Sequence, residues 1–187
     1  MDLQRIIHTL RMIIIFSPMK RAEYLQKKKI FRHVGKNCMV MFRKIPLYSQ
    51  LISLGDNVWI ASNVSFITHD VIHHMLNYEI REKRFAENIG CIDIKDNVFI
   101  GSNTSILSNV TIGPNTIVGA GTLVNKNIQN GVYAGVPAKY ICSMEDFMSR
   151  REQIQKSAIW HHGNGSLTEK EIELQWAAFS GKSVIDS

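Results

Sequence analysis

The chain has 187 residues, which is long enough for one folded domain with appendages. With 45% hydrophobic and 20% charged residues it has the composition of a globular protein, which excludes a disordered or fibrous chain. Lys and Arg number 22 against 16 Asp and Glu, and the net charge of +6 favours an anionic partner. No aromatic–basic motif accompanies this charge, so we expect no nucleic acid among the partners.

The three cysteines, Cys38, Cys91 and Cys142, are scattered and form no C-x-x-C pair. This spacing argues against a disulfide framework and against a cysteine-based zinc site. The apolar run Met12–Phe16 is too short for a signal peptide or a membrane span, and no small-residue cleavage site follows it. We therefore expect a soluble, cytoplasmic protein with no membrane span.

The N-terminal segment, residues 1–32, has the pattern of two helices. Apolar residues mark one face of the first helix: Leu3, Ile6, Ile7, Leu10 and Ile14. Ser17 and Pro18 are the predicted N-cap and first residue of a second helix, which runs to about Lys28. The apolar face of the first helix could lie on a membrane surface, but we favour its packing against the rest of the protein or its oligomer.

The central segment, residues 33–142, repeats every six residues. A first column of aliphatic residues recurs at this step: Ile94, Ile100, Ile106, Ile112, Val118 and Val124. A second, β-branched column follows four positions later: Val98, Thr104, Val110, Thr116, Thr122 and Ile128. Earlier members of the two columns are Leu54, Ile60 and Phe66, and Val58 and Val64. Neither an α-helix nor a simple strand alternation produces a period of six.

A third column holds residues that tolerate tight corners. It lies three positions after the first column and contains Asn57, Asn63, Asn97, Asn103, Asn109, Asn115, Gly121 and Asn127. Asn and Gly accept the left-handed backbone that such corners need. The unit is therefore a short strand and a corner, and three units close a triangular coil of about 18 residues. We predict a mainly β fold, a parallel β-helix.

One corner departs from this pattern. The third position after Phe66 is His69 instead of Asn or Gly, and the next core position holds Asp70. A carboxylate inside a narrow apolar coil would be prohibitively costly, so the chain should leave the coil here. The 28 positions from Phe66 to Ile94 are not a multiple of six, which predicts an inserted loop over about 70–89. His69 would then be an exposed, titratable side chain at the root of that loop.

The stretch IKDNVFIGSNTSILSNVTIGPNTIVGAGTLVNKNIQ, followed by GVYAGVPAKYI, resembles the hexapeptide-repeat acyltransferases. The resemblance covers roughly residues 33–142 and is nearest to sugar and surface-polysaccharide O-acetyltransferases and to galactoside and maltose acetyltransferases. It implies a left-handed parallel β-helix, although parallel crossovers are in general right-handed. It also implies a homotrimer with active sites between subunits, and acetyl-CoA as co-substrate with no metal required.

The resemblance also assigns roles to residues. It implies that His69, in ITHDVIHHML, is the general base that takes the proton from an acceptor hydroxyl during direct acyl transfer. A backbone N–H near Ser102 would stabilise the oxyanion. Asp70 or a backbone carbonyl could orient His69, and His73 and His74 could line the acceptor pocket or lie on the loop surface. The positions that match the coenzyme A groove are Ser102, Ala120, Asn125, Lys126 and Lys139.

The identity of the acceptor stays open. The resemblance implies a hydroxyl of a sugar or of a surface-polysaccharide precursor, with an antibiotic or other xenobiotic hydroxyl, or an amino sugar, as the alternative. Relatives often have a polar substrate-binding residue in an early coil, whereas the stretch Asn37–Tyr48 is apolar and irregular here. The acceptor could therefore differ from a simple galactoside.

Two other functions fit parts of the sequence. Gamma-class carbonic anhydrases share the β-helix and bind zinc with three histidines, and His33, His69 and His74 would supply three imidazoles. The step from Val40 to Leu54 breaks the period of six, however, so His33 should not stack below His69. A non-catalytic hexapeptide scaffold would need no base, and a histidine at an asparagine corner argues against it.

The C-terminal segment, residues 143–187, has the pattern of two further helices. SMED (Ser143–Asp146) has capping-box spacing and opens a helix to about Lys156. SLTE (Ser166–Glu169) opens another, to about Phe179, and a GNG stretch separates the two. We predict a helical extension, to which the sequence assigns no role.

Overall fold

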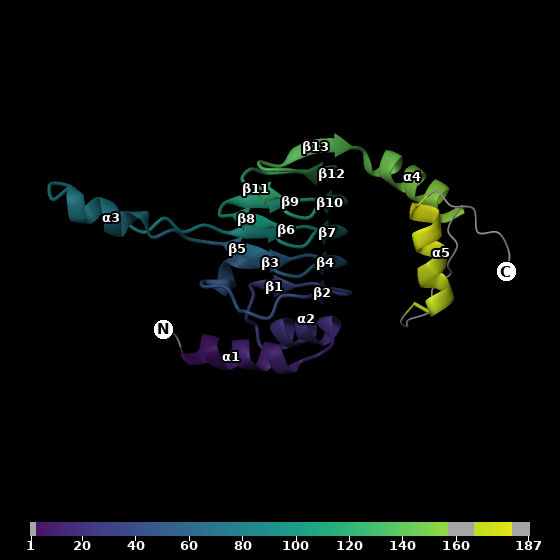
Figure 1. Cartoon of the computed structure of the whole chain (residues 1–187). Helices are drawn as coiled ribbons and strands as arrows, with labels where there is room; N and C mark the ends of the chain where they lie inside the picture. The colour runs from purple at the N-terminus through teal and green to yellow at the C-terminus, as the bar shows by residue number, and fades with distance from the viewer. Residues whose placement is uncertain (1–2, 157–166, 181–187) are drawn as a thin grey trace. The chain divides into compact units, whose positions relative to one another are not determined.

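The computed structural model describes residues 3–156 and 167–180. The chain divides into two compact units, Met1–Met144 and Glu145–Ser187. The first unit contains a stack of three-sided coils, with two helices below its lowest coil and an arm that projects from its side (Figure 1). The second unit contains the helices near the C-terminus.

Three sheets form the sides of the coil, with strands of two to four residues. The first sheet has the parallel strands β1 (His33–Val34), β3 (Ile52–Leu54), β6 (Ile92–Ile94) and β9 (Val110–Ile112). The second has β2 (Met39–Val40), β4 (Val58–Ile60), β7 (Val98–Ile100), β10 (Thr116–Val118) and β12 (Gly131–Ala134), to which β13 (Lys139–Cys142) adds antiparallel. The third has β5 (Ser65–Ile67), β8 (Ser105–Leu107) and β11 (Leu123–Val124). The predicted parallel β-helix is confirmed; its handedness stays a prediction.

The predicted coil of about 18 residues is confirmed by the register between neighbouring strands. Ile92 of β6 pairs with Val110 of β9, 18 positions later. Ile52 pairs with Ile92, 40 positions later, because an insertion separates these two coils without changing the register of the ladder. The lowest coil has an irregular third side, where a 3-10 helix, η1 (Ser49–Leu51), stands in place of a strand.

Both apolar columns face inward, as the period of six predicts. Every member of the first column from Ile94 to Val124 is 0% exposed, and the second column is buried as well. The hydroxyls of Thr104, Thr116 and Thr122 donate to backbone carbonyls, which removes the cost of burying them. Each buried Ile or Val contributes about 1.5–3 kcal/mol, so the stacked columns are the main source of stability.

The corner residues adopt the predicted backbone, with one exception. Six of the predicted asparagines and Gly121 have φ between 49 and 70°, in the left-handed region. Asn37, which the columns did not include, adds a further corner of this kind. Asn127 does not have a positive φ, and its Oδ1 accepts a hydrogen bond from the Thr111 N–H (2.8 Å). The coil is ending at that point, since Ile128 forms only an isolated bridge.

Four of these asparagines stack along one corner and hydrogen-bond to one another. Asn37 donates its amide to Asn57 (2.8 Å), Asn57 to Asn97 (3.0 Å) and Asn97 to Asn115 (3.1 Å). The side chains therefore tie four consecutive coils together along the corner. The sequence predicted the left-handed backbone at these corners but did not predict the hydrogen bonds between their side chains.

The two predicted N-terminal helices are present as α1 (Leu3–Ile14) and α2 (Pro18–Lys27). Ser17 is the N-cap of α2, as predicted, and its hydroxyl accepts from the Lys20 N–H. Arg21 of α2 is 1% exposed, and its guanidinium donates to three backbone carbonyls of the α1–α2 linker and the lowest coil.

Within one chain, the face of α1 that packs on the coil is not the predicted one, and packing of the predicted face against an oligomer stays a prediction. Met12 is fully buried in the core, whereas Leu3, Ile7, Leu10 and Ile14 are 54–69% exposed. Apolar residues lie on more than one side of this helix, and the side with His8 and Met12 is the one that meets the core and α2.

The second unit contains α4 (Met144–Lys156), which begins at the boundary, and α5 (Glu169–Phe179). Both helices were predicted, but the capping box of α5 is formed by Thr168 and Glu171 and not by the SLTE stretch. Thr168 and Glu171 have the three-residue spacing that reciprocal capping needs. Ser166 and the GNG stretch lie outside the described residues.

The description as mainly β is correct only for the coil itself. Each side of a three-sided coil admits a strand of two to four residues, so the described helices contain more residues than the described strands. Among the described helices, none has the length and apolar character that crossing a membrane requires.

Candidate functional site

The chain leaves the coil at His69, as its place in the repeat predicts. Thr68, just before it, is fully buried and donates its hydroxyl to the Leu47 carbonyl (2.8 Å). His69 then forms an isolated antiparallel bridge with Ile89, and the Gly90 N–H donates to the Thr68 carbonyl (2.8 Å). The two ends of the insertion are therefore fastened together beside the coil.

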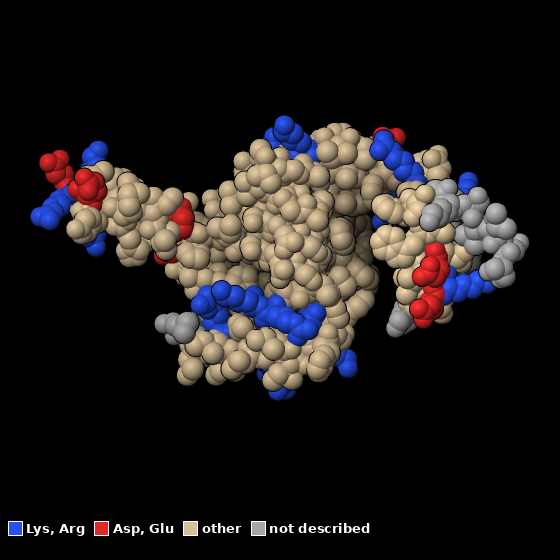
Figure 2. Space-filling view, viewed as in Figure 1, with Lys and Arg blue, Asp and Glu red and all other residues tan. Residues whose placement is uncertain are grey.

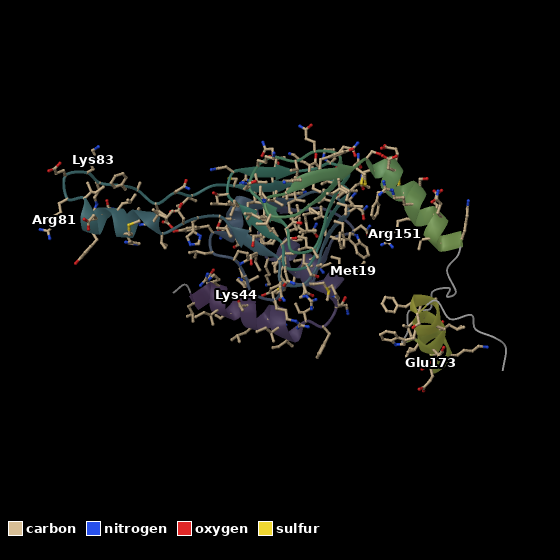
Figure 3. All side chains as sticks on the ribbon, turned by 45° about the horizontal axis from the view of Figure 1, so that its top comes forward. Met19, Lys44, Arg81, Lys83, Arg151 and Glu173 are labelled. Atoms are coloured by element: carbon tan, nitrogen blue, oxygen red, sulfur yellow. The ribbon has the colours of Figure 1, made fainter. Side chains whose placement is uncertain are left out.

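Residues 70–89 form an arm that projects from the coil and contains α3 (Ile72–Glu79), a helix that the sequence did not predict (Figure 1). Arg81 and Lys83 lie at the far tip of this arm (Figure 3). Several apolar side chains of the arm are exposed: Val71, Ile72, Met75 and Tyr78. Contiguous exposed apolar residues are typical of a surface that another chain covers.

Tyr48 packs against His69 from the irregular side of the lowest coil. The two rings meet edge to face, with centroids 5.2 Å apart. The Tyr48 hydroxyl donates to Glu87 Oε2 (3.0 Å), on the returning limb of the arm. This hydrogen bond to a carboxylate is the main cause of a raised pKa of Tyr48, and desolvation adds to it.

The imidazole of His69 is not oriented by Asp70 through a hydrogen bond. Its Nδ1 is buried and has no hydrogen-bond partner within the described part of the chain. The Asp70 carboxylate accepts from the Asn88 amide (3.0 Å) and the Ile72 N–H (3.0 Å), and these two bonds, the first foremost, lower the pKa of Asp70. Asp70 therefore fastens the foot of the arm, while the ring of Tyr48 restrains His69.

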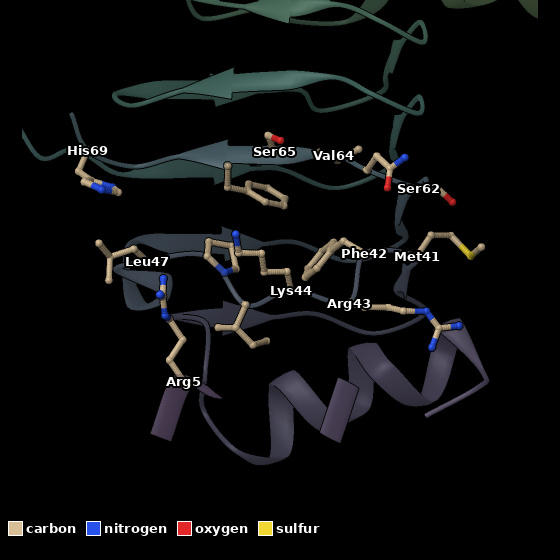
Figure 4. A pocket seen from close by; sticks show the side chains of 14 residues that line it. Arg5, Met41, Phe42, Arg43, Lys44, Leu47, Ser62, Val64, Ser65 and His69 are labelled. Atoms are coloured by element: carbon tan, nitrogen blue, oxygen red, sulfur yellow. The ribbon is translucent and has the colours of Figure 1, made fainter. Parts of the chain in front are cut away.

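An open cavity of about 850 Å³ begins at His69 and runs along β5 (Figure 4). Residues 62–66 form one side of it, and residues 41–47, from the irregular part of the lowest coil, form the other. Arg5 reaches the cavity from α1. The size is in the range of small-molecule sites.

The five residues matched to the coenzyme A groove lie on the upper coils: Ser102, Ala120, Asn125, Lys126 and Lys139. Ser102 and Ala120 belong to the corner that precedes β8 and β11. Lys126 belongs to the corner that follows β11, which continues the corner of His69 upward. None of the five lines the cavity beside His69.

The three histidines of a zinc site are not assembled in this chain. His33 lies on β1 beside Ser53 in the first sheet, whereas His69 follows β5 of the third sheet. His74 is exposed on α3, and its ring centroid is 4.1 Å from that of His73. In the described part of the chain, no group of three His, Cys, Asp or Glu side chains could hold a metal ion.

Sequence reasoning found His69 but missed the other side chains of the cavity. Lys44 and Arg5 of the cavity wall, and Tyr48, which contacts His69 beside it, lie outside the regular repeat, so no column assigns them a position. The irregular stretch Asn37–Tyr48, whose last part forms a wall of the cavity, was the signal that could have found Lys44 and Tyr48, whereas no sequence signal indicated Arg5.

Comparison with known proteins extends these observations. A family model described as bacterial transferase hexapeptide (six repeats) matches residues 92–126. The galactoside O-acetyltransferase of Escherichia coli (strain K12) is 38% identical over 116 residues, which are 61% of this chain and 55% of that enzyme. Protein CapG of Staphylococcus aureus is 37% identical over 129 residues, 66% of this chain and 72% of that protein. The chain belongs to the hexapeptide-repeat acyltransferase family.

This hexapeptide-repeat chain is also similar to solved structures. A galactoside acetyltransferase in complex with coenzyme A matches it with a TM-score of 0.55 and 26% identity, over 89% of this chain and 88% of that one. The sequence alignment with the Escherichia coli enzyme is shorter and spans little more than half of that enzyme's length.

Proposed function

We propose that the protein is an acetyl-CoA-dependent O-acetyltransferase that acts on a hydroxyl of a sugar or of a surface-polysaccharide precursor. The position of His69 carries this proposal, because a titratable imidazole stands at the corner where the coil is interrupted and at the end of a cavity of saccharide size. Similarity to a galactoside O-acetyltransferase, and to a galactoside acetyltransferase with bound coenzyme A, supports the choice of donor and acceptor.

In the proposed reaction His69 is the general base. We assign this role to Nε2, because Nδ1 is buried. Nε2 accepts the proton of the acceptor hydroxyl while that oxygen attacks the thioester carbonyl. The new C–O bond forms, the C–S bond breaks, and the proton passes from the imidazole to the departing thiolate. A backbone N–H near Ser102 would stabilise the developing oxyanion, and the reaction needs neither a covalent enzyme intermediate nor a metal.

We further infer that the active site forms between subunits of a homotrimer of left-handed coils. His69 and Ser102 lie at different corners of two neighbouring coils, so a neighbouring chain would have to bring the donor corner to the base. The exposed apolar residues of the arm support a second chain at this place.

The test is acetyl-CoA consumption with a panel of sugars, nucleotide sugars, amino sugars and antibiotics, in the wild type and in His69→Ala. We expect acceptor-dependent thiol release that falls at least about 10²-fold in kcat in the variant. His33→Ala is the matched control, because His33 is exposed on β1 in another sheet. Unchanged turnover in His69→Ala would refute the mechanism, and a monomer in light scattering would refute the site between subunits.

A further inference from the structure

The cavity beside His69 contains an unbalanced group of cations. Arg5, Arg43 and Lys44 line it, and none of its described lining residues is acidic. In the space-filling view, Lys and Arg side chains gather on this side of the protein, between α1 and the lower coils (Figure 2). The proposed acetyl transfer uses none of the three.

Arg5 and Lys44 have no charge partner among the described residues. Neither side chain makes a hydrogen bond or an ion pair with any of the described residues. Arg5 is only partly exposed, and it rises from α1 toward Leu47 and His69, with Lys44 between it and Arg43 along the wall (Figure 4). Cations held in a partly enclosed cavity focus a positive potential there.

Arg43, unlike Arg5 and Lys44, has a hydrogen-bond partner within the protein. Its guanidinium donates to the Ile13 carbonyl, in the last turn of α1, where a positive charge is favourable. This contact fastens the wall of the cavity to α1, so it keeps the helix that carries Arg5 beside the site.

We propose that Arg5 and Lys44 bind an anionic group of the acceptor, a phosphate or a carboxylate, while the acceptor hydroxyl lies at His69. The inference rests on the proposed function and names its substrate class. The arginine fork matches the oxygens of either anion, and the lysine supplies a point charge. The preferred acceptor is then a charged saccharide, such as a sugar phosphate, a nucleotide sugar or a uronic acid, and not a neutral galactoside.

The phosphates of coenzyme A are the other anions that these cations could meet. The residues matched to the coenzyme A groove lie on the upper coils, and none of them lines this cavity. The cations come from α1 and the irregular side of the lowest coil. Substituting them should therefore change the KM for the acceptor and leave the KM for acetyl-CoA as it is.

Three matched acceptors test the inference: glucose 1-phosphate, glucuronate and neutral methyl glucoside. We expect kcat/KM to be at least about tenfold higher for a charged acceptor, and Arg5→Gln and Lys44→Gln each to raise the KM for that acceptor about tenfold. The KM for methyl glucoside should not change. Arg11→Gln, an exposed arginine of α1 outside the cavity, is the control. Preference for glucose 1-phosphate identifies a phosphate as the bound group, and preference for glucuronate identifies a carboxylate.

The outcomes separate this inference from the proposed function. Equal kcat/KM for all three acceptors in a reaction that depends on His69 would overturn the inference alone, as would a KM change confined to acetyl-CoA. If no acceptor is acetylated, calorimetric titration with glucose 1-phosphate decides. Binding that weakens about tenfold in Arg5→Gln and Lys44→Gln but not in Arg11→Gln supports the site, and the absence of binding overturns it.

Discussion

The rings of Tyr48 and His69 meet edge to face, with centroids 5.2 Å apart and planes inclined at 87°. Since Nδ1 of His69 has no partner in the described chain, this contact is the main restraint on the proposed base. The Tyr48 ring is itself restrained by the hydrogen bond from its hydroxyl to Glu87. The orientation of the histidine therefore depends on the lowest coil and on the arm together.

Removing the Tyr48 ring should reduce catalysis more than removing its hydroxyl. An edge-to-face pair contributes about 0.5–1.5 kcal/mol beyond the burial of its area, so we expect Tyr48→Ala to lower kcat up to about tenfold. Tyr48→Phe keeps the ring and should stay within about threefold of the wild type. Steady-state acetyl transfer measures both. If the two variants are equally impaired, the hydroxyl and not the ring contact positions His69.

The bond between Tyr48 and Glu87 predicts a loss of stability at alkaline pH. The pKa of Tyr48 is raised in the folded state, so its contribution is complete below the unfolded pKa of about 10 and is lost as the pH rises through the folded value. We expect the difference in unfolding free energy between the wild type and Tyr48→Phe to be constant up to about pH 9 and to shrink above about pH 10. Urea denaturation across this range measures it, and a difference that grows with pH would contradict the assignment.

The hydrogen bonds of Asp70 predict that its stabilising contribution is lost at acid pH. Its pKa is lowered by the Asn88 amide and the Ile72 N–H, so its contribution is complete above the unfolded pKa of about 3.9 and is lost as the pH falls through the folded value. Asp70→Asn should speed hydrogen exchange of the Ile72 amide at neutral pH and leave that of Ile94 in the core unchanged. The two proteins should converge as the pH falls below the lowered pKa of Asp70 in the folded state. Identical exchange at neutral pH would show that Asp70 does not fasten the arm.

Substitutions at Asn57 can distinguish the cost of left-handed backbone from the contribution of the side-chain hydrogen bonds in the asparagine stack. Asn57 has φ 56° and bonds to Asn37 below and Asn97 above. Asn57→Ala loses these bonds and places a Cβ in the left-handed region, so we expect a loss of about 2–3 kcal/mol in unfolding free energy. Asn57→Gly relieves the backbone and should be about 1 kcal/mol more stable than the alanine variant. Equal stability of the two would show that the side-chain bonds alone matter.

Arg21 should be essential for attaching the N-terminal helices. It is 1% exposed and donates to the carbonyls of Val40 (2.9 Å), Ile15 (2.7 Å) and Phe16 (3.1 Å). Arg21→Met leaves these carbonyls without their donor, and we expect a loss of about 3 kcal/mol in chemical denaturation. Lys20→Met, at the exposed neighbouring position, should change stability by less than about 0.5 kcal/mol. A small effect of Arg21→Met would mean that Met12 and its contacts suffice.

Most of the coil could be predicted because its buried positions recur with the six-residue period of the sequence. Each side of a coil turns one residue of each column inward, so the two columns already describe the core. The corners were visible because left-handed backbone selects Asn and Gly. The exit of the chain at His69 was visible for a related reason, since Asp70 cannot occupy a core position.

The cavity could not be predicted in this way, because its walls have no repeat. Residues 41–47 and α1 take their places through contacts that are distant in sequence, such as Arg43 with the Ile13 carbonyl. The amphipathic pattern of α1 did not show that Met12 would be buried, because apolar residues occur on several of its sides. Tyr48 reaches His69 only because the lowest coil lacks a third strand.

Because the two ends of the arm are joined beside the coil, the length of the arm can change without a change in the coil. Ile52 and Ile92 pair as neighbours across the whole insertion, and the bridge between His69 and Ile89 joins its two ends. Doubling the length of a closed loop costs only about 0.6 kcal/mol in chain entropy. Evolution, or a protein engineer, can therefore exchange the arm for one of another length or composition without repacking the core, and so alter the surroundings of the base while the base keeps its position.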